Sequence, residues 1–278
     1  MTKHRRRRHG CARFLFGVLI LAALAGWFWW QQNGLVSETY TIPGAPAAFR
    51  GYRIALLSDL HGKEFGEDNE RLIDYVAGLE PDCIALTGDI LDRAEQTDRL
   101  PALIRGLSAL APTYYVTGNH EWAVGGVPEL KELLAENGAT VLSNEYVTET
   151  REGVTLAIAG ADDPNGFADQ KTGDVLRQEI DADYVLLLTH RDTVEKYSDW
   201  GYDLILCGHG HGGMFRIPFL DKGLISSQHT LFPEYDGGCY PMEGGGWCVI
   251  SRGLGSNTVP FRAFRLFNRP DVPLVVLE

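Results

Sequence analysis

The sequence has few cysteines, few basic residues outside its first segment, and no internal repeat. Its five cysteines are scattered and odd in number, which excludes a small disulfide scaffold. Six of the 25 Lys+Arg lie in residues 1–13, so the other 19 stand against 37 Asp+Glu, a net charge of −18. Nucleic acid is therefore not an expected partner, because phosphate contacts need a basic surface. An acidic body suits a protein that collects divalent cations.

Length and composition indicate an ordinary globular protein. The chain has 278 residues, of which 45% are hydrophobic and 22% charged. These fractions exclude intrinsic disorder and collagen-like classes. A chain of this size buries about three-quarters of its unfolded surface, so a full hydrophobic core is expected.

One long apolar run lies near the N-terminus. Residues 14–30 carry no charge and follow a basic segment, residues 1–13. As a helix they would span about 26 Å, and the uncharged stretch continues to Ser37, which provides the length of a transmembrane helix. Residues 27–30 read Trp-Phe-Trp-Trp, typical of an interfacial aromatic belt. We expect a single-pass membrane anchor with residues 1–13 in the cytoplasm and the remaining chain outside.

A cleaved signal peptide is the competing interpretation of this run, because Ala23-Leu24-Ala25 has the A-x-A form. The protein would then be secreted. Cleavage there would leave Gly-Trp-Phe-Trp-Trp exposed at the new N-terminus, which favours the uncleaved anchor. We expect residues 31–50 to form a linker with turns at Pro43 and Pro46, and residues 51–278 to form one domain.

Short apolar runs alternate with helical patterns from Arg53 onward, as in an α/β protein. The predicted strands are Ile54–Leu57, Cys83–Thr87, Tyr114–Thr117, Val154–Ile158, Tyr184–Leu188, Asp203–Leu206, Trp247–Ser251 and Leu274–Leu277. The predicted helices are Asn69–Leu79, Pro101–Leu110 and Pro128–Asn137.

Polar residues follow three of these strands at equal spacing. Asp59, Asp89 and Asn119 are thirty residues apart, twice, which is the length of a βαβ unit. They should therefore emerge at the carboxyl edge of one sheet, where ligands of open α/β sheets bind. Five of the six body histidines also follow apolar strands directly: His61, His120, His190, His209 and His211.

This accumulation predicts a metal site. One such histidine would be an ordinary loop or core residue, and His229 is expected to be an ordinary loop residue. Carboxylate, imidazole and amide ligands without a thiolate suit Mn, Fe, Zn or Co. Eight such groups are too many for one ion and indicate two ions that share a bridging carboxylate.

The ordered set Asp-x-His, Gly-Asp-x-x-Asp, Gly-Asn-His-Glu, a lone His and Gly-His-x-His resembles the signature of the calcineurin-like metallophosphoesterases. The resemblance runs from about Arg53 to the C-terminus. Further blocks, such as residues 160–164 and 267–270, resemble the membrane-anchored bacterial phosphodiesterase branch. The resemblance implies a four-layer α/β/β/α sandwich after one N-terminal transmembrane helix, and two divalent ions, with Mn favoured.

The resemblance also implies a role for each site residue. Asp59, His61 and His211 would hold one ion, Asn119, His190 and His209 the other, and Asp89 would bridge them. His120 would be catalytic and donate a proton to the leaving oxygen. Asp92 would orient a ligand histidine from behind.

The expected reaction is hydrolysis of a phosphodiester or pyrophosphate by a hydroxide that bridges the two ions. The substrate would be a phosphorylated small molecule or a lipid-linked one, met at the membrane surface. A phosphomonoesterase or phosphoprotein phosphatase would use the same metals and stays open. A purple acid phosphatase is excluded, because that group needs a tyrosine where this chain has Asp92. A non-catalytic metal-dependent binding module is the alternative of another class, and the complete histidine set favours catalysis over it.

Two questions stay open at this point. Cys239 and Cys248 flank a glycine-rich turn, and whether they pair depends on geometry. The aromatic side chains at 232, 235, 240 and 247 would either line a substrate mouth or pack beneath the loop. The sequence identifies no protein partner.

Overall fold

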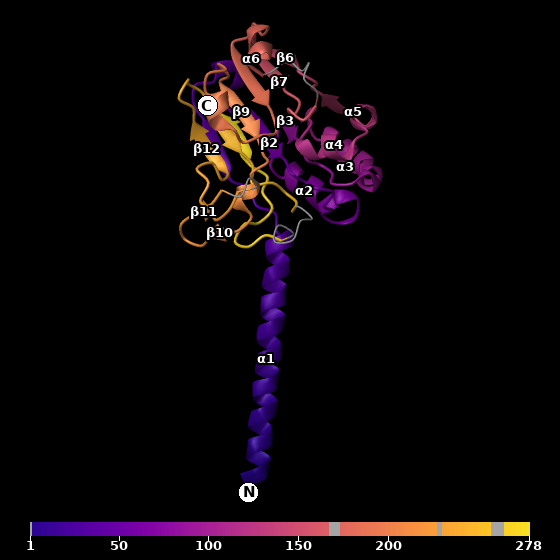
Figure 1. Cartoon of the computed structure of the whole chain (residues 1–278), viewed down its shortest axis with the longest axis vertical. Helices are drawn as coiled ribbons and strands as arrows, with labels where there is room; N and C mark the ends of the chain where they lie inside the picture. The colour runs from indigo at the N-terminus through magenta and orange to yellow at the C-terminus, as the bar shows by residue number, and fades with distance from the viewer. Residues whose placement is uncertain (1, 167–172, 227–229, 257–263) are drawn as a thin grey trace.

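Helix α1 (Thr2–Asn33) projects from the rest of the chain, which forms a body at its C-terminal end (Figure 1). This computed structural model describes residues 2–166, 173–226, 230–256 and 264–278. Within α1, the span Ala12–Asn33 is long and apolar enough to cross a membrane. One apolar helix near the N-terminus is what either a membrane anchor or a signal sequence requires.

Two six-stranded mixed sheets form the centre of the body. The first has the order β1 (Thr39–Ile42), β14 (Leu274–Leu277), β2 (Arg53–Leu57), β3 (Cys83–Thr87), β4 (Thr113–Val116) and β5 (Ala139–Val141). The second has the order β12 (Gly238–Pro241), β13 (Trp247–Ile250), β9 (Leu204–Cys207), β8 (Tyr184–Leu188), β7 (Val154–Gly160) and β6 (Glu145–Arg151). A separate hairpin pairs β10 (Arg216–Ile217) with β11 (Lys222–Gly223).

Helices cover the outer faces of both sheets. On the first sheet these are α2 (Glu70–Ala77), α3 (Leu100–Ser108) and α5 (Val127–Glu136), and on the second α6 (Gly173–Gln178) and α7 (Val194–Tyr197). The remaining helical segments are η1 (Ala47–Phe49), η2 (Glu67–Asn69), η3 (Ala94–Arg99), α4 (Asn119–Val124) and η4 (His211–Gly213).

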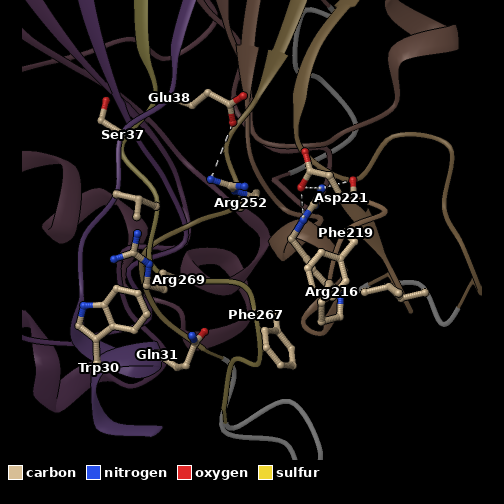
Figure 2. A pocket seen from close by; sticks show the side chains of 13 residues that line it. Trp30, Gln31, Ser37, Glu38, Arg216, Phe219, Asp221, Arg252, Phe267 and Arg269 are labelled. Atoms are coloured by element: carbon tan, nitrogen blue, oxygen red, sulfur yellow. Dashed lines mark hydrogen bonds and ion pairs between the residues drawn. The ribbon is translucent and has the colours of Figure 1, made fainter. Parts of the chain in front are cut away.

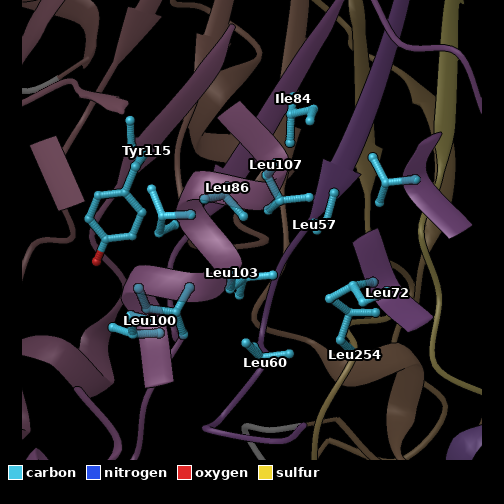
Figure 3. Packing of buried hydrophobic residues seen from close by; sticks show 14 of the residues in the cluster. Leu57, Leu60, Leu72, Ile84, Leu86, Leu100, Leu103, Leu107, Tyr115 and Leu254 are labelled. Carbon is cyan, nitrogen blue, oxygen red and sulfur yellow. The ribbon is translucent and has the colours of Figure 1, made fainter. Parts of the chain in front are cut away.

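Three buried clusters separate these four layers. Alternation along β2 sends Ala55 and Leu57 into a cluster beneath α2 and α3, shown in Figure 3, and Ile54 and Leu56 into a cluster between the sheets. The third cluster lies between the second sheet and α6 and α7. Strands buried on both faces read as continuous apolar runs. The predicted four-layer sandwich is therefore confirmed.

The sequence prediction is incomplete where strands lie at sheet edges. Residues 31–50, predicted as a linker, contain the end of α1 and strand β1, which pairs in parallel with β14. Strand β6 alternates between exposed and half-buried residues and is rich in Glu and Thr, so no apolar run announces it. The predicted helices are present, with ends shifted by one or two residues.

Candidate metal centre

The predicted site residues lie where strands of both sheets end. Asp59 and Asp89 follow β2 and β3, and Asn119 begins α4 after β4. His190 and His209 follow β8 and β9. Because β2, β3 and β4 run parallel, as do β8 and β9, these loops gather at carboxyl edges, where α/β proteins bind ligands.

The loops at this edge have unusual backbone conformations. Asp59, His61, Asp89, His209 and His211 have φ between 50° and 71°, a region that residues other than glycine seldom adopt. Such conformations persist only where surrounding contacts enforce them, and they cluster at functional sites. Here the backbone N–H of His209 donates to both carboxylate oxygens of Asp59, at 3.2 and 3.0 Å. This contact joins the edges of the two sheets.

Two glycines allow the loops to approach each other closely. A Cβ on Gly208 would collide with the side chains of Ser58 and Asp59. A Cβ on Gly118 would collide with the carboxylate of Asp89. The glycines of the two motifs are therefore required by the packing of the site itself.

Asp59, His61 and His211 form the first group of candidate ligands. The Nε2 atoms of His61 and His211 are 3.0 Å apart. Asp59 Oδ1 lies 3.6 Å from His211 Nε2 and 3.9 Å from His61 Nε2. All three residues are buried, and one ligand atom from each lies within 4.8 Å of the others.

His190 is at the centre of a second group. Its Nε2 lies 3.2 Å from Asn119 Oδ1, 3.1 Å from His209 Nδ1 and 3.2 Å from Asp89 Oδ2. The same oxygen of Asp89 lies 3.9 Å from His61 Nε2 in the first group. Asp89 thus faces both groups, as a shared carboxylate must.

The hydrogen bonds around the histidines fit two bound cations. His61 Nδ1 donates to Asp92 at 2.5 Å, and His190 Nδ1 donates to the carbonyl oxygen of Thr87 at 2.8 Å. In the neutral tautomers the Nε2 atoms therefore carry lone pairs, and these lone pairs face carboxylate oxygens. Acceptors that converge in this way repel one another unless a cation lies between them. The donor set of imidazole and carboxylate groups suits divalent transition metals.

The pKa values of His190 and His209 shift in opposite directions. Burial opposes the charged form of His190, but Asp89 outweighs it and raises the pKa of His190 to about 10. Burial and the charge of His190 lower the pKa of His209 to about 2. The direction of the His190 shift means that the carboxylate of Asp89 favours positive charge at this position.

Asp92 contacts two histidines rather than one. Its Oδ1 accepts from His61 Nδ1 at 2.5 Å and lies 2.7 Å from His120 Nδ1. Burial would raise the pKa of Asp92, yet His120 and His61 lower it to about 2. The ionised carboxylate therefore fixes both the ligand histidine that the sequence predicts for it and the predicted proton donor.

His120 is the most open imidazole of the cluster. Its side chain is 24% exposed, whereas those of His61 and His190 have no exposed surface. Its ring meets the ring of His61 edge-on at 4.6 Å, and its Nε2 lies 3.9 Å from Asp89 Oδ2. Burial lowers the pKa of His120, but Asp92 and Asp89 outweigh burial and raise it.

Glu121 supports the loops of the site, a role that its motif position does not announce. Its carboxylate is fully buried and accepts the backbone N–H groups of Asp89 at 2.9 Å, Ile90 at 2.8 Å, Leu91 at 3.4 Å and Gly118 at 2.7 Å. Burial and the charge of Asp89 raise the pKa of Glu121 to about 7. One side chain thus joins the loops that carry Asp89 and Asn119.

Replacing Glu121 with alanine should destabilise the protein by about 3 kcal/mol or more, because four buried N–H groups lose their acceptor. Metal affinity should fall with stability, since the Asp89 loop loses its support. Urea unfolding and metal titration would measure both effects. Glu132→Ala, at an exposed position of α5, is the matched control and should change stability by less than about 0.5 kcal/mol. An equally mild effect at Glu121 would contradict this role.

An arginine beside the second group was also not predicted. The guanidinium of Arg191 forms a two-pronged ion pair with buried Asp163 at 2.5 and 3.0 Å. Its third nitrogen lies 3.4 Å from His209 Nε2. The available signals were its position after His190 and the Ala-Asp-Asp-Pro block that contains Asp163.

Buried Arg265 connects the end of α1 with the metal edge. Its guanidinium donates to the carbonyl oxygens of Gly255 and Arg252, both at 2.8 Å, and lies 3.4 Å from His211 Nδ1. Its backbone exchanges hydrogen bonds of 2.7 and 2.8 Å with the side-chain amide of Gln32 in the last turn of α1. A single residue, Arg265, therefore contacts both the apolar helix and the candidate metal ligand His211.

The open question about the cysteines has a geometric answer. Cys239 lies opposite Val249 in the antiparallel pair of β12 and β13, so it packs in the core between the sheets, while Cys248 packs on the other face. They cannot form a disulfide in this arrangement. The sulfur of Cys248 lies instead 3.8 Å from that of Cys207.

Three of the four aromatic side chains pack against the buried clusters, and the fourth does not. The rings of Tyr235 and Tyr240 meet edge-on at 5.1 Å and pack against the cluster between the second sheet and α6 and α7. Trp247 packs against the cluster between the two sheets. Phe232 is exposed. His229 lies outside the described residues.

Comparison with known proteins identifies the family. The profile of the calcineurin-like phosphoesterases matches residues 52–213. The chain is 28% identical to the uncharacterised metallophosphoesterase YkuE of Bacillus subtilis, over 95% of both chains. It is 30% identical to an uncharacterised metallophosphoesterase of Aquifex aeolicus, over 87% of this chain and 91% of that one. It is 28% identical to phosphodiesterase YaeI of Escherichia coli, over 81% and 82%.

Among solved structures, the sulfate thiohydrolase SoxB of Thermus thermophilus superposes with a TM-score of 0.51 and 16% identity. The match covers 77% of this chain and 54% of that one, so the chain spans about half the length of SoxB. This likeness concerns the fold alone. The profile match and the buried His/Asp groups together show that this chain belongs to the calcineurin-like phosphoesterase family and is a metal-dependent phosphoesterase with a His/Asp dimetal site.

Proposed function

We propose that this chain is a membrane-anchored hydrolase of phosphodiesters or pyrophosphates that works at the membrane surface. The assignment of ligands follows the two groups of side chains, with Asp89 shared between them. Asp59, His61 and His211 would hold one ion, and Asn119, His190 and His209 the other. Bound divalent ions, with Mn the first to test, supply Lewis acidity and lower the pKa of a nearby water.

His120 is the proposed proton donor to the leaving oxygen. The observation that carries this role is the shared carboxylate: Asp92 contacts Nδ1 of both His61 and His120. Asp92 thereby holds the His120 ring with Nε2 turned toward the metal side, 3.9 Å from Asp89 Oδ2. This ring is also the most exposed imidazole of the cluster. A proton on Nε2 can then pass to an alkoxide that departs from phosphorus.

Arg191 is proposed to contribute positive charge beside the second group. Asp163 holds the guanidinium from one side, while its remaining nitrogen lies next to His209. A guanidinium fixed in this way attracts phosphoryl oxygens without losing its position, because its ion pair with Asp163 is already formed.

A proton donor serves diesters and monoesters of ordinary alcohols alike, so the choice of a diester rests on a relative. An alkoxide is a poor leaving group, so a positioned histidine has most effect on esters of ordinary alcohols. The relative YaeI is named a phosphodiesterase. Phosphomonoesters and phosphoproteins remain the alternatives with the same metals.

Anchoring by α1 is supported by the exposed aromatic side chains at 27–30, which cleavage after Ala25 would leave in water at a new N-terminus. Gln31 is buried and Gln32 hydrogen-bonds to Arg265, while Arg269 lies over the ring of Trp30 at 4.0 Å. Residues 30–32 belong to the folded body, and they would remain in the chain with or without cleavage after Ala25. The basic segment, residues 1–13, favours a cytoplasmic N-terminus and an extracytoplasmic body.

The full chain, purified in detergent and loaded with Mn²⁺, should hydrolyse bis(p-nitrophenyl) phosphate with a kcat/KM at least about tenfold above that for p-nitrophenyl phosphate, a difference of about 1.4 kcal/mol in transition-state stabilisation. Initial rates over a range of substrate concentrations give both constants. The Asp89→Ala variant, purified identically, identifies any contaminating activity. A preference for the monoester would assign a phosphomonoesterase instead. Tight metal binding without turnover of either ester would assign a binding module.

A further inference from the structure

Exposed apolar side chains of the body concentrate in one region. Outside α1, nine large apolar side chains of the described residues are exposed, and three of these are scattered: Leu110, Tyr146 and Val175. The other six belong to the β10–β11 hairpin and its neighbourhood: Phe219, Leu220, Leu224, Leu231, Phe232 and Phe267. Phe219 and Leu220 form the hairpin tip, where Phe219 is fully exposed and Leu220 is 67% exposed. Apolar side chains that gather in one exposed patch, rather than scatter singly, mark a surface that binds a membrane or a partner.

This region lies at the end of the body from which α1 projects. Figure 1 shows β10 and β11 beside the point where the helix enters the body. The rings of Phe267 and Trp27 lie 5.4 Å apart, so the exposed apolar side chains of the body are continuous with those of the helix.

The helix leaves no spacer between a membrane and the body. The uncharged part of α1, from Phe14 to Asn33, is about 30 Å long at 1.5 Å per residue, which equals the hydrocarbon thickness of a bilayer. Gln31 is already buried in the body, at 4% exposure. If α1 spans a bilayer, the end of the body around it must lie at the level of the lipid headgroups.

A cavity between α1 and the hairpin is lined by the kinds of side chain that proteins place at the level of the lipid headgroups. It has a volume of about 560 Å³. Figure 2 shows Trp30 on one side of it, Phe219 of the hairpin on the other and Phe267 between them. Arginine side chains lie among these rings, two of them paired with the carboxylates of Glu38 and Asp221. Arg269 stacks on Trp30 at 4.0 Å. Aromatic rings mixed with arginines are typical of the interface between lipid and water.

We propose that the hairpin tip, Phe219 with Leu220, inserts together with Phe267 into the interfacial layer of the bilayer beside α1. The inference rests on the proposed anchoring by α1 and adds a second point of attachment to it. Two attachments prevent the body from swinging about the helix end. Because Arg265 links that end to His211, the metal edge would be held at a constant height above the lipid.

Nitroxide labels on the full chain would test this insertion. Cys11 and Cys239 are first replaced by alanine, and single cysteines are then placed by Phe219→Cys, Leu21→Cys and Val175→Cys. Each protein is reconstituted in vesicles of equal parts phosphatidylcholine and phosphatidylglycerol. Collision rates with oxygen, which enriches in lipid, and with a water-soluble nickel chelate report the depth of the label. Val175, on α6, is the matched control, since it is an exposed apolar residue away from α1 in Figure 1.

The label at 219 should collide mainly with oxygen, as the label at 21 does, while the label at 175 should collide mainly with nickel. A label at 219 that is as accessible to nickel as the one at 175 would overturn the insertion while leaving the anchor intact. A label at 21 in water would overturn the anchor and the insertion together. Spin–spin broadening at 219 in detergent would assign the patch to a second copy of this chain instead. None of these readouts depends on phosphoesterase activity.

Discussion

Replacing His120 with alanine is expected to lower kcat by about 10²–10⁴-fold on a phosphodiester of an ordinary alcohol, the range for loss of a general acid. Metal content should stay at the wild-type value, because none of the seven proposed ligands changes. The loss should be much smaller on bis(p-nitrophenyl) phosphate, since p-nitrophenolate leaves with little need for a proton. Steady-state rates on both esters, with metal analysis of the same samples, measure the effect.

Two further variants distinguish proton donation by His120 from the orientation of its ring by Asp92. His120→Gln retains a polar side chain beside Asp92 but carries no acidic proton, so it should behave like His120→Ala. Asp92→Asn keeps the imidazole but weakens its hold on both His120 and His61, and should cost about 10- to 100-fold, as loss of a ligand's supporting partner does. If His120→Ala slows both esters equally at constant metal content, His120 is not the proton donor and stabilises charge on the phosphoryl group instead.

Replacing Asp89 with alanine is expected to remove activity down to the uncatalysed background on every ester. Asp89 is the carboxylate that faces both groups, 3.2 Å from His190 Nε2 and 3.9 Å from His61 Nε2. It also accepts the backbone N–H of His120 at 2.8 Å. Metal content and activity should therefore fall together, whatever the leaving group.

Elemental analysis and thermal unfolding with and without a chelator would measure this second effect. Wild-type protein should hold two divalent ions per chain and lose melting temperature when they are removed, because ions that bind only the folded state stabilise it. Asp89→Ala should hold fewer ions and respond less to the chelator. Asp74→Ala, which removes an exposed carboxylate from α2, should match the wild type. Two tightly held ions in Asp89→Ala would contradict the shared-carboxylate assignment.

Local sequence was sufficient to predict the central strands of both sheets and the sheet edge at which the polar site residues lie. Continuous apolar runs such as residues 184–188 predict strands buried on both faces, because a central strand must be apolar throughout. The thirty-residue spacing of Asp59, Asp89 and Asn119 predicts three loops at one edge, because parallel strands joined by helices return to the same side. Strand β6 escaped this reasoning, since an edge strand with one face in water carries no apolar run.

Contacts between distant loops were decided by the tertiary structure alone. The family resemblance implies that Asp92 lies behind a ligand histidine, but only the packing of two loops brings both His61 and His120 to one of its oxygens. Glu121 reads as a surface-type residue until the fold surrounds its carboxylate with four backbone N–H groups. The link from Gln32 through Arg265 to His211 joins segments more than fifty residues apart. Hydrophobic periodicity and motif spacing indicate which residues of each segment pack into the core. Hydrogen bonds between loops depend instead on backbone direction and side-chain rotamers, which are fixed only when both sheets are in place.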